Sequence, residues 1–161
     1  MNHSAAKITL ELLIATGLGY RVNSVTPVDW MVFVNKQVPR KLMSTSDFEV
    51  SKCLYVFDTG GIVGSRLNPT GEFPESYGIQ LMLRLNEFDD YVGYNKAKTI
   101  ETYFDTQINR YTVSVTDGAS TNYLVHNYLR TSNIIRTNEM EDDSIVGLMY
   151  TMNFLMYVTQ V

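Results

Sequence analysis

The residues of this chain that could do chemistry gather in one short acidic segment. The sequence NEMEDDSIVG, residues 138–147, places four carboxylates within five positions. Clustered carboxylates can bind Mg²⁺, and two-metal nucleases rely on such groups. Those sites collect carboxylates from separate strands and add a Lys or His, whereas these four are close neighbours in the chain: Glu139, Glu141, Asp142 and Asp143. The segment also lacks the alternating Asp/Asn and central Gly of a calcium-binding loop.

Three interpretations of this acidic segment remain open at the level of sequence. The pattern favours a solvated connection, kept polar so that the apolar strand after it does not mispair. A charged contact with another protein is the second interpretation. A metal or acid/base site is the third, and its local spacing is poor for that chemistry.

The rest of the chain offers little support for catalysis. The run GGIVGS, residues 60–65, follows a predicted strand, but neither Gly-Lys-Ser/Thr nor a helix follows, as a phosphate-binding loop would need. His3 and His126 are the only histidines and lack metal-ligand spacing. Cys53, the only cysteine, opens a predicted buried strand, where a thiol is normally an inert small hydrophobic group. We therefore expect no catalytic residue, no metal and no cofactor.

Composition indicates one globular domain with large contact surfaces. The chain has 161 residues, of which 45% are hydrophobic and 19% charged, enough for one domain with a core. Its formal net charge is −4 and its 13 Lys and Arg are scattered, so no basic patch for nucleic acid is visible. The 11 tyrosines and 8 methionines suit protein interfaces as well as a core. The lack of a long uninterrupted apolar run predicts a protein without a membrane span, in the cytosol of a host cell.

Two helices are predicted. Ser4 is a plausible N-cap for a helix over residues 5–16, which ends at Gly17. This helix is apolar on two sides, so its second side packs either against another subunit or within the same chain. The second helix is predicted from Asp89 to about Ile108, with acidic residues in its first turn. Its buried stripe is Gly93, Ala97, Ile100, Phe104 and Ile108.

The strands come from short apolar or alternating runs. We predict them over residues 29–34, 53–58 and 77–85, with a hairpin turning at Asp117-Gly118 and one long final strand after residue 143. A Gly/Pro-rich loop is expected over residues 59–76. The predicted fold class is α+β, a mixed and mainly antiparallel sheet packed against two α-helices in a single domain over residues 1–161.

Two segments resemble the tail-terminator and minor capsid proteins of long-tailed bacteriophages. They are IQLMLRLNEFDDYVGYNKAKTIETYF, residues 79–104, and NEMEDDSIVGLMYTMNFLMYV, residues 138–158. In those families a strand ending near an Arg leads into a helix, and an acidic turn precedes a final strand with an Asn-Phe-like pair, here Asn153-Phe154. The likeness covers mainly residues 77–158, and its motifs are patterns of residue class rather than catalytic signatures.

The resemblance implies a structural virion protein, assembled in the host cytoplasm, and not an enzyme. Such a subunit forms a ring, expected to be hexameric, that caps the tail tube and joins it to the head connector. Its partners would be further copies of the chain, the tail tube protein and the connector or neck protein, with DNA passing through the ring without specific binding.

From this we expect Glu141, Asp142 or Asp143 to face an Arg or Lys of a neighbouring subunit. Arg84, Arg40 and Lys41 are further candidate interface residues. Two alternative functions stay open, a metal-dependent nuclease or phosphatase using residues 139–143 and a small ligand-binding or regulatory α/β module.

Overall fold

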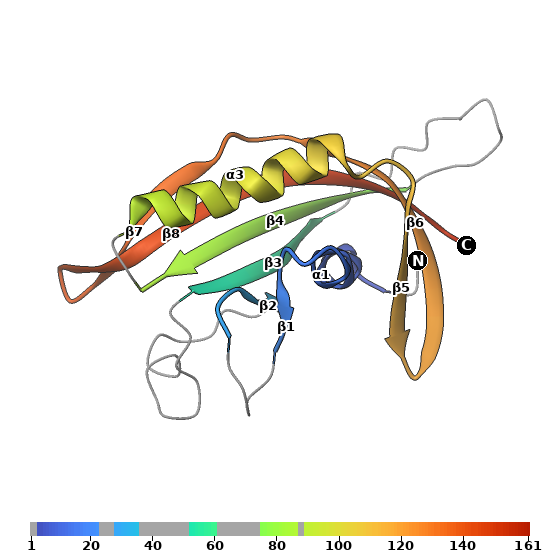
Figure 1. Cartoon of the computed structure of the whole chain (residues 1–161), viewed down its shortest axis with the longest axis horizontal. Coiled ribbons are helices and arrows are strands. Elements are labelled where there is room, and N and C mark those ends of the chain that lie inside the picture. The colour runs from blue at the N-terminus through green and yellow to red at the C-terminus, as the bar shows by residue number, and fades with distance from the viewer. Residues whose placement is uncertain (1–2, 23–27, 36–51, 61–74, 87–88) are drawn as a thin grey trace.

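In the part of the chain that the structure describes, two helices pack against a long, curved sheet (Figure 1). The computed structural model describes residues 3–22, 28–35, 52–60, 75–86 and 89–161. In chain order the elements are α1 (Ala5–Ala15), β1 (Tyr20–Arg21), β2 (Met31–Val34), β3 (Lys52–Gly60), β4 (Glu75–Leu85), α3 (Asp90–Thr106), β5 (Tyr111–Asp117), β6 (Ala119–Arg130), β7 (Ile135–Glu141) and β8 (Ser144–Gln160). This confirms the predicted α+β class with a mixed, mainly antiparallel sheet.

The strand order is β1-β2-β3-β4-β8-β6-β5, and β7 pairs with β8 off this path. The pairs β1–β2 and β2–β3 are parallel, and all the others are antiparallel. One edge of β8 carries β4, while β7 and β6 follow one another along its other edge. The 17-residue strand β8 is therefore the spine of the sheet.

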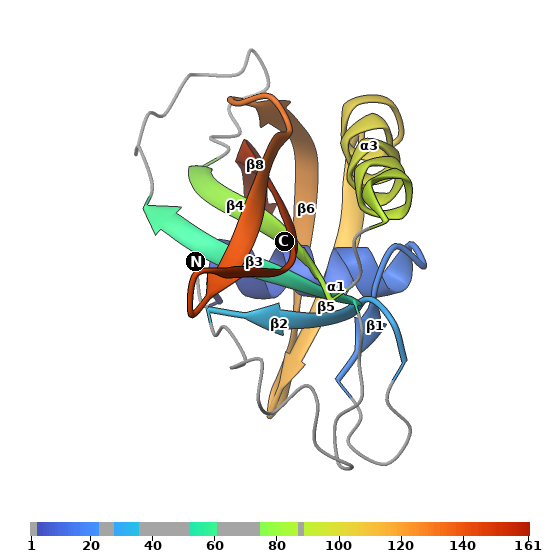
Figure 2. The ribbon, with the colours of Figure 1, turned by 90° about the vertical axis from the view of Figure 1, so that its left-hand side faces the viewer.

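Helix α1 lies in the concave side of the sheet, and seven of its 11 residues are buried. The hydroxyl of Ser4 accepts a hydrogen bond from the amide of Lys7 at 3.2 Å, which confirms the predicted N-cap. The carboxylate of Asp58 accepts another from the amide of Ala6 at 2.8 Å. Because the sheet curls, α1 contacts β1 and β5, the strands at its two ends (Figure 2). Both apolar sides of the helix are thus covered within the chain, so the second-subunit interpretation of α1 is wrong.

Helix α3 packs on the same face, over β4, β6 and β8. Asp89 caps its N-terminus by accepting from the amides of Tyr91 and Val92. All five residues of the predicted stripe are buried. At Gly93 an added Cβ would lie 2.3 Å from Cε2 of Tyr150, so glycine is what allows this close approach.

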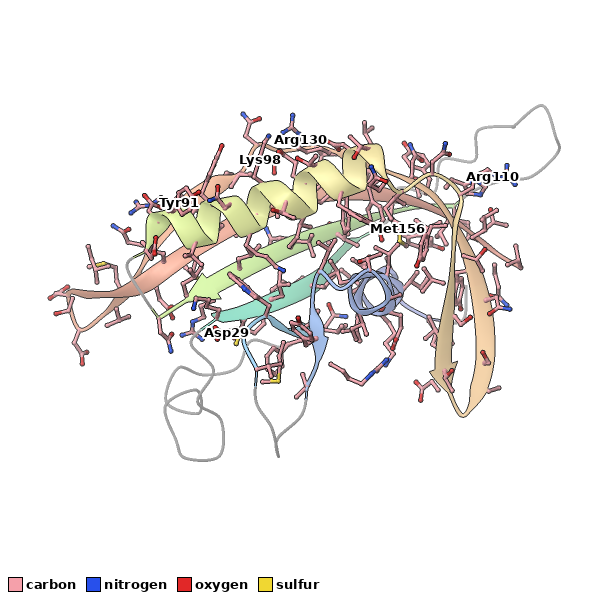
Figure 3. The ribbon with its side chains drawn as sticks, viewed as in Figure 1. Asp29, Tyr91, Lys98, Arg110, Arg130 and Met156 are labelled. Atoms are coloured by element: carbon pink, nitrogen blue, oxygen red, sulfur yellow. The ribbon has the colours of Figure 1, made fainter. Side chains whose placement is uncertain are left out.

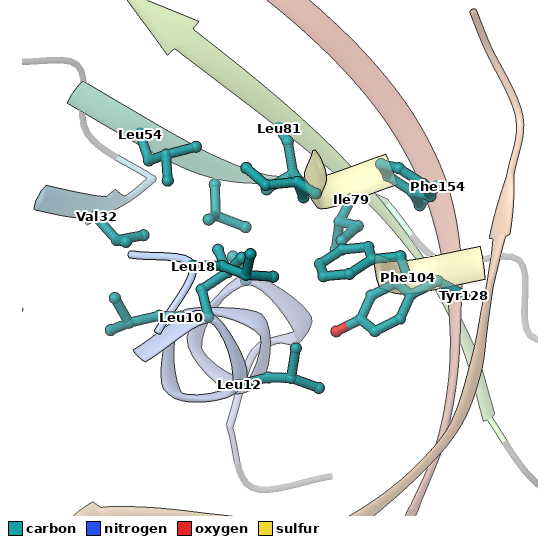
Figure 4. Close-up of a cluster of buried hydrophobic side chains, with 14 of the residues drawn as sticks. Leu10, Leu12, Leu18, Val32, Leu54, Ile79, Leu81, Phe104, Tyr128 and Phe154 are labelled. Atoms are coloured by element: carbon teal, nitrogen blue, oxygen red, sulfur yellow. The ribbon is translucent and has the colours of Figure 1, made fainter. Parts of the chain in front are cut away.

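One continuous core joins the two helices to the sheet (Figure 4). Alternation along β4 sends Ile79, Leu81, Leu83 and Leu85 into it, as predicted, and all four are fully buried. Phe104 of α3 stacks on Tyr128 with ring centroids 4.1 Å apart and meets Phe154 edge-on at 5.2 Å. The Tyr128 hydroxyl and the Thr9 hydroxyl share a hydrogen bond of 2.9 Å, which ties α1 to the same cluster.

Several boundaries differ from the sequence prediction. Residues 29 and 30 are a turn before β2, where Trp30 has φ of 67°. The Asp117-Gly118 hairpin is confirmed, with Gly118 at φ +79°. Most of the predicted Gly/Pro loop, residues 61–74, lies outside the described residues, while its two ends belong to β3 and β4. Strand β7 was not predicted at all.

Candidate functional site

The acidic segment forms the end of a β-hairpin rather than an irregular connection. Its first half belongs to β7, which pairs with β8. The solvated turn is only Asp142 and Asp143, which have φ of 47° and 60°. Two adjacent positive φ values are the geometry of a type I′ turn, the usual connection for two-residue hairpins. The interpretation of the whole segment as a connection is therefore wrong for residues 139–141.

Glu139 is held by Arg84, which reaches it from β4. The Nε of Arg84 donates to one carboxylate oxygen at 2.8 Å, and a terminal nitrogen donates to the other. The strand between them is β8, where Gly147 lies opposite Glu139 and brings no side chain. The two side chains are 4% and 15% exposed. We expected Arg84 at an interface, but its guanidinium is buried and bound within its own chain.

The buried neighbours of Arg84 are chemically quiet. Its pKa is lowered by burial but raised more by the hydrogen bonds to Glu139 and Tyr55, so the guanidinium stays charged. Burial raises the pKa of Tyr55 to about 12, and burial raises the pKa of the Cys53 thiol to about 11. A thiol that stays protonated is a poor nucleophile, which agrees with the inert role expected for Cys53.

The end of the β7–β8 hairpin extends past the last residue of β4. Pairing between β4 and β8 stops at Leu85 with Leu148, whereas β8 begins at Ser144 (Figure 1). Met140 and Ile145 are cross-strand partners there and are 56% and 45% exposed. We call Met140, Asp142, Asp143 and Ile145 the hairpin tip. It combines two exposed apolar side chains with two exposed carboxylates.

A second exposed surface lies along the outer side of α3. It brings tyrosines and cations together from segments far apart in the chain, and we define this α3 surface as Tyr91, Tyr94, Lys98, Arg130 and Arg136. Figure 3 shows Lys98 and Arg130 near one another on the outer side of the helix. Tyr91 and Tyr94 are 77% and 49% exposed, and they border a hollow of about 400 Å³ whose other walls include Ile134 and Arg136.

Ion pairs organise the α3 surface. The buried carboxylate of Glu101 accepts from Lys98 and from Arg130. Burial acts to raise its pKa, but these two hydrogen bonds outweigh it and the pKa is lowered. At the N-terminal end of the helix, the hydroxyl of Tyr150 and the Nε of Arg136 donate to Asp90, and together they lower the pKa of that carboxyl.

Among the described residues, the sheet face opposite the helices is partly exposed over β8 and its neighbours. Its partly exposed residues on β8 are Met149, Thr151, Asn153, Leu155, Tyr157 and Thr159. Across the sheet they adjoin Met82, Leu129 and Ile135, of which the last two are 51% and 48% exposed. No residue of β8 is charged, and none of the described helices covers this face. We call these nine residues the open sheet face.

A metal or acid/base site finds no support in the parts of the chain that are described. No group of three His, Cys, Asp or Glu side chains there could hold a metal ion. His3 is bonded to the hydroxyl of Tyr123 at 2.8 Å, and His126 is bonded to that of Thr159 at the same distance. Both histidines therefore have structural partners, far from the acidic hairpin.

The structure brings together only part of the predicted interface set. Asp142 and Asp143 lie side by side at the tip, and Glu141 is the last residue of β7. Arg84 is buried within the protein. Arg40 and Lys41 are not among the residues that the structure describes. The sequence reasoning missed the α3 surface. Its helical half could have been found from the spacing i, i+3, i+7 of Tyr91, Tyr94 and Lys98.

Comparison of the sequence with models of known protein families finds no match, and no curated protein matches it either. Among the described helices, none is both long and apolar enough to cross a membrane.

Proposed function

We propose that this chain is a structural virion protein that forms a ring, expected to hold six copies, at the end of a phage tail tube. Its other contacts would be the tail tube protein and the head–tail connector. The family resemblance of residues 77–158 motivates this assignment. The observation that carries it further is the open sheet face.

The open sheet face has the size and chemistry of a protein contact. From Met149 to Thr159 the strand extends about 34 Å, and three strands are about 14 Å wide, so the part of the sheet beneath this face covers roughly 480 Å². Patches of this size on a protein surface are often functional. The face is uncharged apart from the Arg84–Glu139 pair beside it, which is internally neutralised. Packing against another protein therefore removes apolar area from water without stranding a charge.

Charge supports the passage of DNA without specific binding. The net charge is −4, and most of the described Lys and Arg side chains are paired with carboxylates. Phosphate binding needs cations that are free to replace counterions. An acidic ring would repel the DNA backbone rather than retain it.

The enzymatic alternative has no observation in its favour. In the described structure Glu139 is bound by Arg84, and Asp142 and Asp143 lie on an exposed turn with no His or Lys among their described partners. A ligand-binding module would need an enclosed pocket, whereas the hollow beside Tyr91 and Tyr94 is open to solvent. Calorimetric titration with Mg²⁺ or Mn²⁺ tests the enzymatic alternative. A heat of metal binding that is seen in the wild-type chain and disappears in Asp142→Asn/Asp143→Asn would support it.

The experiment that tests the proposal is native mass spectrometry of the purified chain, alone and mixed with the tail tube protein. The expected result is a closed oligomer, alone or on addition of the tube protein. A chain that stays monomeric in both samples at every concentration contradicts the proposal.

A further inference from the structure

We infer that the hairpin tip of one copy docks on the α3 surface of a second copy. This inference rests on the proposed function, because it names the contact through which neighbouring copies would join. Both surfaces are exposed on one chain, and they match in apolar content, in charge and in position.

The apolar match is between two exposed aliphatic side chains on the tip and two exposed tyrosines on the α3 surface. Met140 and Ile145 stand next to one another on the tip, each about half exposed. On the α3 surface, Tyr91 and Tyr94 border a hollow of about 400 Å³. A hollow of that size can take two aliphatic side chains, and buried Tyr side chains are common anchors of protein interfaces.

The charges match as well. The α3 surface has three cations, Lys98, Arg130 and Arg136, and the carboxylates that contact them are Glu101 and Asp90. Lys98 and Arg130 share the single carboxylate of Glu101, so that pair keeps one positive charge, while Arg136 is matched by Asp90. The tip contributes the exposed carboxylates of Asp142 and Asp143. Lys98 and its neighbour Arg130 lie more than two helical turns from Asp89, the carboxylate at the start of α3. We therefore expect Asp142 and Asp143 of the tip to dock beside Lys98 and Arg130.

The position of the two surfaces excludes contact within one copy. Arg136 lies beside the start of α3, and Met140 is four residues further along β7, about 13 Å away. The helix runs from Asp90 in the direction away from the tip (Figure 1). A contact between different surfaces of identical copies is head-to-tail, and such contacts close into rings when the rotation fits.

The turn carries carboxylates at a conformational cost. Two positive φ values favour Asn-Gly, and an Asp-Asp pair there is less stable and also places like charges side by side. Replacing Asp142-Asp143 by Asn-Gly should therefore change the stability of the chain and the association between copies in opposite directions. Asp142→Asn/Asp143→Gly should raise the melting temperature of the chain, while weakening association between copies about tenfold or more.

A matched control comes from the other hairpin. Asp117 is exposed at the turn between β5 and β6, so Asp117→Asn removes one surface carboxylate at a comparable site and should leave association unchanged. Tyr94→Ala tests the receiving surface, and it should weaken association as the turn variant does because Tyr94 is exposed and contributes little to folding.

A disulfide identifies the contact directly. In the variant Met140→Cys/Tyr94→Cys, the two positions are too far apart within one copy for a disulfide, which needs Cα atoms within about 7 Å. Oxidation should give covalently linked oligomers, and Cys53 stays unreactive because it is buried. Met140→Cys/Asp117→Cys is the control pair and should remain unlinked.

These experiments distinguish a failure of the inferred contact from a failure of the proposed function. A wild-type oligomer that is unaffected by the turn and Tyr94 variants, and whose paired cysteines stay unlinked, overturns the inference and leaves the proposed function standing. Tips that cross-link only to the tail tube protein also overturn it. A wild-type chain that is monomeric with and without the tube protein contradicts the proposed function itself.

Discussion

Replacing Arg84 by Met tests the most buried charged contact of the fold. The change keeps the length of the side chain and removes the guanidinium, so that Glu139 loses two hydrogen bonds. Removing one partner of a buried ion pair costs about 3–5 kcal/mol. The Glu139 side chain is 15% exposed, so water can partly solvate it and the lower end, about 3 kcal/mol, is expected. For a domain of this size that is a fall in melting temperature of about 6–12 °C.

The assay is urea unfolding of wild type and Arg84→Met at one protein concentration, followed by circular dichroism. The matched variant is Arg84→Met/Glu139→Leu, which replaces both charges by apolar groups and should be clearly more stable than Arg84→Met. Both variants lose the hydrogen bond between Arg84 and Tyr55, so that loss cancels in the comparison. The difference between the single and double variants measures the penalty of leaving Glu139 unpaired. A loss below about 1 kcal/mol in Arg84→Met would refute the reasoning that this pair is internal and well buried.

Three further predictions concern packing, charge and reactivity. Gly93→Ala should destabilise the chain by about 1–3 kcal/mol in thermal unfolding, because its Cβ would meet the ring of Tyr150; an unchanged melting temperature would mean that the helix shifts freely. Asp90 has a lowered pKa, so its contribution is present above the pKa of the unfolded chain and is lost as pH falls through the folded value. Asp90→Asn should therefore reduce the acid sensitivity of unfolding, and a Tyr150→Phe variant in which the pKa of Asp90, followed by NMR, does not rise would argue against the hydrogen bond as its cause. Cys53 should react with a thiol reagent only after unfolding in urea, since burial raises its pKa to about 11; rapid labelling of the native chain would contradict its buried place.

The helices and the core could be predicted because they depend on local signals. Ser4 and Asp89 mark the helix starts, and the spacing of the α3 stripe gives its buried side. Alternation along β4 likewise predicts which of its side chains enter the core. These patterns follow the period of about 3.6 residues in a helix and of two residues in a strand, and both periods can be recognised in a single sequence.

Long-range pairing could not be predicted in the same way. Strand β7 has polar and charged residues on both faces, because it lies at the edge of the sheet and beyond the reach of most of the core. The partner of Glu139 is 55 residues away in the sequence, and only the pairing of β4 and β7 with β8 brings Arg84 to it. The same holds for Arg130, which joins Lys98 at Glu101 through the packing of α3 on β6.

The curvature of the sheet explains why the two apolar sides of α1 do not require a second subunit. Two apolar sides require two covering surfaces, and a flat sheet offers one. Here one sheet supplies both, since β1 and β5 meet the helix from opposite ends of the strand order. The need for a second subunit at α1 disappears, and the candidate contacts move to the open sheet face, the hairpin tip and the α3 surface.

The central claim is that this chain is a ring-forming structural subunit, and the mass of its native assembly tests it most directly. Native mass spectrometry at micromolar concentration, with and without the tail tube protein, should find one closed oligomer, expected to be six copies of the 18.3 kDa chain. A monomer under both conditions would contradict the account.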